Sequence, residues 1–266
     1  IDGAGPSRTT HGLTILASGS FVRGLAVPRF PGEGIRLQNA TGVVLAGNYV
    51  GTDGTLDLGN GTLGIWVLSC SGVTLQDNVV SGNDHTGISI YQSHNNVVER
   101  NRIGTDAAGA TGLGNGNQGL YVDNSNDNVL RGNVIAANGG VGIAFQCAGT
   151  SENVVAGNYI GTDVTGTLAM GNAGSGIRLD RSAKTVIGGT TAAERNVISA
   201  NRFDGIVISS YPQPARYNVV AGNFVGTDAT GRLPLGNGHN GMDVAFSASS
   251  TRIGTNGDGV ADDAER

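Results

Sequence analysis

Short segments in which apolar and polar residues alternate recur along the whole chain. Each begins with glycine followed by an apolar residue, as in Gly34-Ile35-Arg36-Leu37 and Gly119-Leu120-Tyr121-Val122. None shows a helical period, and alternation with a period of two is typical of a strand that buries one face. We therefore expect short strands separated by turns rich in glycine, asparagine and serine.

Two polar phrases stand between these segments in alternation. The longer phrase is GNYVGTD at 47–53, which returns as RNRIGTD at 100–106, GNYIGTD at 157–163 and GNFVGTD at 222–228. The shorter phrase is DNVVSGN at 77–83, with further copies GNVIAAN at 132–138 and RNVISAN at 195–201. A strand-only repeat of this length that buries one face predicts a solenoid, here with long and short coils in alternation.

The repeat resembles that of the right-handed parallel β-helix, or pectin-lyase-like, family of secreted bacterial proteins. The resemblance rests on Asn-x-[Ile/Val]-x-x-Asn followed by Gly-Ile-x-[Val/Ile], and it covers nearly the whole chain. It implies an all-β, right-handed parallel β-helix of about eight to nine coils. We expect residues 1–266 to form a single domain that is a segment of a larger protein.

Stacked coils turn each repeated sequence position into a column of side chains. The first column holds the asparagines that open the phrases, namely Asn48, Asn78, Asn101, Asn133, Asn158, Asn196 and Asn223. The second column holds Phe30, Asn60, Asn83, Asn115, Asn138, Asn172, Asn201 and Asn237. A polar row of this kind is either a binding surface or a ladder of amides that bond between coils, and we expect two ladders because buried amides need partners.

Composition and charge narrow the classes of function. The chain of 266 residues has 46 glycines, a net charge of −5 and a single lysine, Lys184. An acidic balance with scattered arginines argues against a nucleic-acid partner. No apolar run reaches the ~20 residues of a membrane span. Together with the family resemblance, this predicts an extracellular or cell-surface protein.

In the family that the chain resembles, the outward face of the Gly-Ile-x-Val strand commonly carries a polysaccharide groove. On that face the spacing brings aromatic, amide and arginine side chains onto nearby coils, and the candidate ligand-binding residues are Arg36, Trp66, Tyr91, Tyr121 and Gln146. Aromatic rings offer apolar surface for sugar C–H groups, and polar side chains supply directional hydrogen bonds.

Two carboxylates and a guanidinium on the same face are candidate catalytic residues. Asp123 and Asp180 lie two coils apart, so their backbones should be ~9.6 Å apart, near the upper end of the range for an inverting glycosidase. Arg178 would neutralise the carboxylate of a uronate. The chain nevertheless lacks the Asn-Thr-Asp, Asp-Asp, His-Gly and Arg-Ile-Lys motifs of polygalacturonases and the Asp-Pro-His-Asp motif of mannuronan epimerases.

Two hypotheses of different classes follow. The first is a non-catalytic extracellular β-helix that serves as a rigid scaffold, an adhesin or a glycan-contact surface, and the regular columns favour it because catalytic sites usually break local rules. The alternative is a polysaccharide lyase, glycoside hydrolase or uronate epimerase. Under both, the expected partner is a polysaccharide or another extracellular glycan. Unpaired strand edges also predict end-to-end or neighbouring-domain contacts.

Calcium is the one cofactor that the sequence suggests. The segment 255–265 resembles a thrombospondin type 3 calcium loop in which Asn256, Asp258 and Asp262 would be the ligands. Its first carboxylate position holds Gly254, so an acidic surface loop is the favoured interpretation and a calcium site is the alternative. The Thr-Asp pair that ends each long phrase is expected to cap its own turn, because aspartate commonly does so.

The two cysteines are predicted to be separate thiols. Cys70 and Cys147 lie three coils apart, which corresponds to ~14 Å at the strand spacing of a sheet. A disulfide needs Cα atoms within about 7 Å.

Overall fold

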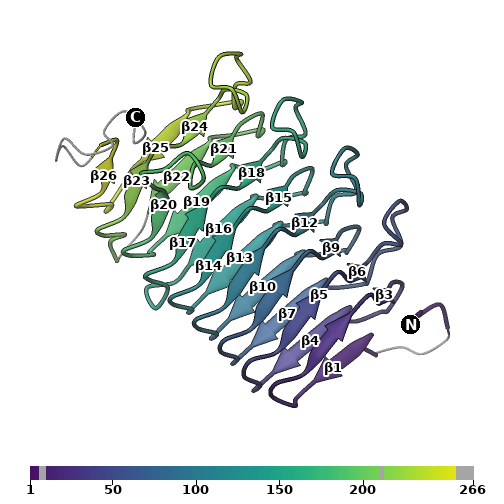
Figure 1. Cartoon of the computed structure of the whole chain (residues 1–266). Coiled ribbons are helices and arrows are strands. Elements are labelled where there is room, and N and C mark those ends of the chain that lie inside the picture. Colours follow the sequence, from purple (N-terminus) through teal and green to yellow (C-terminus); the bar gives the residue numbers. More distant parts are fainter. Residues whose placement is uncertain (6–9, 210–212, 256–266) are drawn as a thin grey trace.

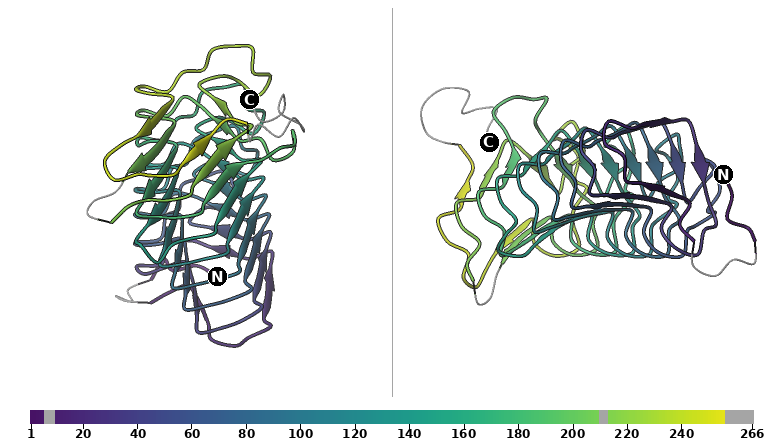
Figure 2. Two further views of the ribbon diagram at one scale, coloured as in Figure 1. Left: turned by 90° about the vertical axis from the view of Figure 1, so that its left-hand side faces the viewer. Right: turned by 90° about the horizontal axis from the view of Figure 1, so that it is seen from below.

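The computed structural model describes residues 1–5, 10–209 and 213–255. Over these ranges the chain winds into a rod of stacked coils, most of which carry three short strands (Figure 1). The coils follow one another along a single axis, with β1 at one end of the rod and β25 and β26 at the other (Figure 2). No helix occurs among the described residues, and none of them could therefore form a membrane-spanning helix.

Three parallel sheets run along the rod. The first sheet consists of β1 (Leu13–Ile15), β4 (Ile35–Gln38), β7 (Ile65–Leu68), β10 (Ile88–Tyr91), β13 (Leu120–Asp123), β16 (Ile143–Gln146), β19 (Ile177–Asp180), β22 (Ile206–Ser209) and β25 (Met242–Val244). The second consists of β2 (Phe21–Arg23), β5 (Val44–Ala46), β8 (Thr74–Gln76), β11 (Val97–Glu99), β14 (Val129–Arg131), β17 (Val154–Ala156), β20 (Val186–Gly188), β23 (Val219–Ala221) and β26 (Arg252–Ile253). The third consists of β3 (Ala26–Val27), β6 (Tyr49–Val50), β9 (Val79–Val80), β12 (Arg102–Ile103), β15 (Val134–Ile135), β18 (Tyr159–Ile160), β21 (Val197–Ile198) and β24 (Phe224–Val225).

The alternation in the sequence places one side chain in two inside the rod. In β7, for example, Ile65 and Val67 are fully buried, whereas Trp66 and Leu68 face outward and are half-buried. The inward residues of all three sheets form one continuous apolar cluster along the axis. The predicted all-β, right-handed parallel β-helix with its stacked coils is thus confirmed.

Both predicted asparagine ladders are present and fully engaged. In the first, the Asn133 side-chain amide donates to Asn158 Oδ1 at 2.9 Å and to the Val98 carbonyl at 2.9 Å. Its own Oδ1 accepts the backbone N–H and the side-chain amide of Asn101. The second ladder repeats this pattern from Asn60 to Asn237. Each amide therefore ties its coil to the next one without leaving a buried polar group unpaired.

A third, shorter ladder lies at the turn between the first and second sheets and was not predicted. Asn96 donates to Asn128 Oδ1 at 2.8 Å, and Asn128 donates to Asn153 Oδ1 at 3.0 Å. The preceding coil has Val73 in this slot, and its backbone N–H donates to Asn96. Because this position is not asparagine in every coil, the column cannot be recognised from a repeated residue in the sequence.

The loops that follow β6, β12, β18 and β24 protrude along one side of the rod (Figure 1). Each is closed by its aspartate, as the sequence predicts. Asp163 Oδ1, for example, accepts the backbone N–H groups of Thr167 and Leu168 at 3.0 and 2.9 Å. Burial would raise the pKa of Asp163, but these bonds and that from the Thr165 hydroxyl outweigh it, and the pKa is lowered.

The loops also bond to one another across the short coils. The N–H of Ala107 donates to the Gly54 carbonyl at 2.8 Å, and later loops repeat this contact. In the short coil between them, Val79 faces outward from the third sheet yet is only 4% exposed. The stacked loops therefore act as a cover for the third sheet, whereas the outward face of the first sheet is free of them.

Candidate functional site

The outward face of the first sheet carries the predicted column of side chains. The strand register pairs Trp66 with Ser89, Ser89 with Tyr121, Tyr121 with Ala144, and Ala144 with Arg178. Long side chains on β7, β13 and β19 thus alternate with short, buried ones on β10 and β16. This alternation makes the face uneven in the length of its side chains.

A hollow of about 160 Å³ lies above Ala144. It forms because the alanine methyl is short while its neighbours in the column, Tyr121 and Arg178, are long. The complete lining is Gln118, Tyr121, Val141, Ala144, Phe145, Gln146, Arg178 and Asp180. Four of the predicted residues, Tyr121, Gln146, Arg178 and Asp180, are therefore brought together in one place.

Tyr121 organises one wall of this hollow. Its phenolic oxygen lies 2.7 Å from Gln146 Oε1 and 3.1 Å from Asp123 Oδ2. A hydroxyl carries a single proton, so these two acceptors compete for it. Burial, followed by the negative charge of Asp123, raises the pKa of Tyr121. The phenol is consequently held in its neutral, proton-donating form.

Asp123 stands beside the hollow but does not line it. In addition to the Tyr121 hydroxyl, this carboxylate faces the Cys147 thiol, and the interaction, together with burial, raises the pKa of Cys147. On the far wall, Asp180 Oδ1 lies 3.5 Å from Nε of Arg181. Both candidate catalytic carboxylates thus interact with other side chains of this chain, Asp123 with Tyr121 and Cys147 and Asp180 with Arg181.

One residue that lines the hollow and two that stand beside its carboxylates were not predicted from the sequence. Gln118 stands two residues before β13, outside the strand alternation, and reaches the hollow from the turn. Cys147 and Arg181 follow β16 and β19 with φ of +73° and +59°. Left-handed backbone at non-glycine residues is uncommon and cannot be recognised from alternation. No pattern in one sequence marks where these side chains point.

The other predicted ligand-binding residues lie on the same face but outside the hollow. The Arg36 guanidinium sits 4.6 Å from the centre of the Trp66 ring, which covers one side of the indole. Tyr91 lies in the neighbouring column, in register with Leu68 and Asp123. These residues extend the face toward the β1 end of the rod.

Metal ligands were also predicted, but Asn256, Asp258 and Asp262 lie outside the described residues. Within the described ranges, no group of three or more histidine, cysteine, aspartate or glutamate residues is placed to hold a metal ion. Cys70 and Cys147 are both free thiols, as predicted from their spacing.

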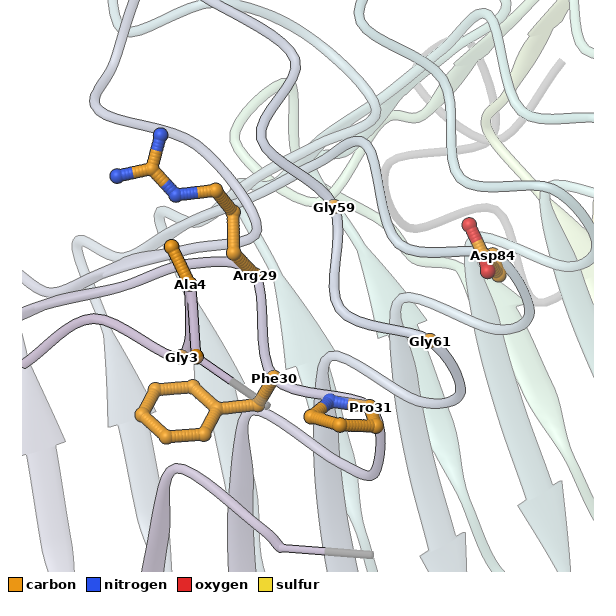
Figure 3. Close-up of a pocket in the computed structure, with 9 residues that line it drawn as sticks. Gly3, Ala4, Arg29, Phe30, Pro31, Gly59, Gly61 and Asp84 are labelled. Atoms are coloured by element: carbon orange, nitrogen blue, oxygen red, sulfur yellow. The ribbon is translucent and has the colours of Figure 1, made fainter. Parts of the chain in front are cut away.

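A larger depression of about 610 Å³ lies near the β1 end, at the turns before the first sheet. Figure 3 shows that its labelled side chains do not converge, since Arg29 and Asp84 lie on opposite sides of it. The Arg29 guanidinium is instead paired with Asp2. The hollow above Ala144 remains the better candidate because amide, phenol, guanidinium and carboxylate groups meet there.

The chain was compared with protein-family models, curated proteins and solved structures. The right-handed β-helix region model matches residues 11–169, more than half of the chain. A search of curated proteins gave no significant match. The fold is similar to that of the periplasmic alginate epimerase AlgG, with a TM-score of 0.57 and 20% identity over 82% of this chain and 50% of that chain.

Two other solved structures are similar at lower identity. The A-module of the Azotobacter vinelandii mannuronan C-5 epimerase AlgE4 gives a TM-score of 0.51 and 14% identity, over 88% of this chain and 65% of that one. The enzymatically active domain of bacteriophage CBA120 tailspike protein 2 gives 0.50 and 16%, over 88% and 39%. The chain thus spans between about two fifths and two thirds of these structures, and at such identities the likeness concerns the fold. From the family-model match, the chain belongs to the right-handed β-helix family.

Proposed function

We propose that the outward face of the first sheet binds an extracellular polysaccharide and that the chain is a non-catalytic β-helix module. The observation that carries this proposal is the hollow above Ala144, where the Tyr121 ring, two glutamine amides, the Arg178 guanidinium and the Asp180 carboxylate converge. A small concave site with a few converging polar groups is the usual form of a ligand site.

The chemistry of the hollow suits an acidic sugar. Arg178 is exposed and forms no ion pair with any described residue, so its charge is available to a carboxylate or sulfate. An arginine binds a carboxylate with two parallel hydrogen bonds. Gln118 and Gln146 supply amides for hydroxyl groups, and the Tyr121 ring offers an apolar flank.

The surroundings of the carboxylates favour binding over catalysis. Asp123 holds the Tyr121 hydroxyl and faces the Cys147 thiol, and it does not line the hollow. The raised pKa of Tyr121 makes its phenol a poor base near neutral pH. Asp180 is left as the single carboxylate in the hollow, whereas glycoside hydrolysis normally needs two.

A polysaccharide-modifying enzyme is the second candidate. What favours it is that Arg178 and Asp180 lie in the same hollow and that the similar solved structures are described as epimerases and as an enzymatically active tailspike domain. The descriptions of a periplasmic protein and a phage tailspike also support an extracellular or cell-surface location for this chain.

A glycan panel with two readouts tests the proposal. Trp66 is the only tryptophan in the chain and lies in the same outward column as Ala144, so its fluorescence reports a polysaccharide that extends along the face from the hollow. We expect a saturable change with an acidic polysaccharide, such as polymannuronate or polygalacturonate, and no change in the glycan itself. A flat response to acidic and neutral glycans alike would overturn the binding proposal. Product formation that is lost in Asp180→Ala would show that the enzyme candidate is right.

A further inference from the structure

Asparagine followed by glycine occurs five times among the described residues, and one of the five differs from the others. The pairs begin at Asn60, Asn115, Asn138, Asn237 and Asn240. The first four belong to the second asparagine ladder, whereas Asn240 stands just before β25 and outside all three ladders. Asparagine is thermolabile, and its reactivity depends on the local structure.

The four ladder pairs are restrained at both reacting groups. The Asn115 amide donates to Asn138 Oδ1 and to the Val80 carbonyl, and the N–H of Gly116 donates to the Asn83 carbonyl at 2.8 Å. Even at the end of the ladder, Asn237 donates to the Ile198 carbonyl at 3.0 Å. The N–H of Gly238 beside it is bonded to the Asn201 carbonyl at 2.8 Å. Each such pair must open locally before it can react.

Asn240 has neither restraint. Its side chain is exposed and makes no hydrogen bond to a described residue, while its backbone N–H is held by Asp204 Oδ1 at 3.0 Å. The N–H of Gly241 also lacks an acceptor among the described residues. The glycine at this position in the preceding coil, Gly205, donates instead to the Asn240 carbonyl at 2.9 Å. A Cβ built on Gly241 would meet nothing closer than Val225 at 3.6 Å, so there is room for the backbone to move.

We propose that Asn240 is a site of spontaneous deamidation. The Gly241 nitrogen loses its proton and forms a bond to Cγ of Asn240, and the Cγ–Nδ2 bond breaks to release ammonia. The resulting five-membered succinimide is then opened by water at either carbonyl. One opening gives aspartate, and the other gives isoaspartate, in which the backbone runs through the side-chain carbon. The reaction needs water alone, with no oxidant, reductant or enzyme.

The position of Asn240 gives this reaction a structural consequence. Its carbonyl accepts the Gly205 N–H, and the Gly241 carbonyl accepts the Ile206 N–H at 3.1 Å. These two bonds dock β25 onto β22 at the start of their pairing. An isoaspartate lengthens the backbone at this point by one carbon, so that both acceptors can no longer stay in register. The modification therefore loosens Met242–Val244 from the sheet.

Peptide mapping of the folded chain after incubation in mildly alkaline buffer tests the proposal with an internal control. Trypsin cleaves after Arg232 and Arg252, so one peptide carries both Asn237 and Asn240, and fragment ions assign the mass gain to either residue. We expect conversion at Asn240 to be at least about tenfold faster than at Asn237, because Asn237 reacts only after local opening. The same peptide in the urea-denatured chain should show comparable rates at both residues.

One variant and one further measurement complete the test. Asn240→Gln should leave the peptide unmodified on the same timescale, because its side chain would have to close a larger ring. Hydrogen exchange at 242–244 should rise in aged wild-type protein and stay constant in aged Asn240→Gln. Equal conversion at Asn237 and Asn240 in the folded chain, or none at Asn240 while the denatured chain reacts, would overturn the proposal.

Discussion

The Tyr121 hydroxyl lies 3.1 Å from Oδ2 of Asp123, two residues further along the same strand. Residues i and i+2 of a strand point to the same face, so the sequence alone places the two side chains together. Their contact turns Asp123 toward Tyr121 and leaves Gln118, Gln146, Arg178 and Asp180 to supply the polar groups of the hollow. Asp123 and Tyr121 thus hold one wall of the hollow in place, while the other four side chains face the proposed ligand.

The raised pKa of Tyr121 predicts a specific loss of stability in alkali. A phenol whose pKa is higher in the folded than in the unfolded chain stabilises the fold fully below the unfolded value of about 10, and the contribution is lost as the pH rises toward the folded value. We expect the free energy of unfolding of the wild type to fall more steeply above about pH 10 than that of Tyr121→Phe. Urea denaturation across this pH range measures the free energy of unfolding of both proteins. If the two values fell equally with pH, the raised pKa of Tyr121 would be contradicted.

The ladders predict that a buried asparagine amide contributes far more to the free energy of unfolding than an exposed one does. Asn133→Ala would take away the amide that donates to the Val98 carbonyl and to Asn158 Oδ1. It would also remove the oxygen that accepts the backbone N–H and the side-chain amide of Asn101 in the core. We expect the free energy of unfolding to drop by about 3 kcal/mol or more, since each unsatisfied buried group costs roughly 1–3 kcal/mol. Asn117→Ala, at an exposed turn, should change it by less than about 0.5 kcal/mol. Equal effects in chemical denaturation would argue against the ladder as a source of stability.

The stacked loops predict that alanine substitution destabilises the fold to different extents at two glycines with similar backbone angles. Gly166 and Gly19 have φ of +70° and +68°. A Cβ on Gly166 would lie 2.7 Å from the Ala229 Cβ in the next loop and 3.0 Å from the Tyr159 ring, whereas Gly19 faces open space. Gly19→Ala should cost about 1–2 kcal/mol of backbone strain, and Gly166→Ala about 1–3 kcal/mol more through overpacking. Thermal or urea unfolding compares them, and equal losses would mean that the loops do not touch as described.

The two thiols should react slowly and in a fixed order. Burial raises the pKa of Cys70, and the Asp123 carboxylate raises that of Cys147, so both reactive thiolates are scarce at neutral pH. Because Cys70 is only 2% exposed and Cys147 is half-buried, we expect a thiol reagent to label Cys147 first. The labelling rate should rise with pH beyond the usual thiol pKa of about 8.5. Mass spectrometry follows each site, with Cys147→Ser as the control, and faster labelling of Cys70 would be inconsistent with its burial.

Much of this fold is encoded in features that one sequence displays. Period-two alternation sets the strands, and the repeated asparagines fix the register, so Trp66, Tyr121 and Arg178 are placed in one column from spacing alone. The third ladder was not predicted because the position that Asn96 occupies in its coil is held by Val73 in the preceding coil. The hollow exists because the side chain of Ala144 is much shorter than those of its neighbours Tyr121 and Arg178. No sequence motif marks such a gap. Gln118 reaches the hollow from the turn before β13, and Arg181 follows β19 with a left-handed backbone, so neither position belongs to the strand alternation.

Calorimetric titration of an acidic oligosaccharide into three matched proteins tests the central claim most directly. Arg178→Gln removes the charge from the hollow, and Arg232→Gln removes an exposed charge from the loop after β24. Loss of a charged hydrogen bond predicts an affinity at least about tenfold lower for Arg178→Gln, with Arg232→Gln binding as the wild type does. An unchanged affinity in Arg178→Gln, or an equal loss in both variants, would contradict the placement of the glycan site above Ala144.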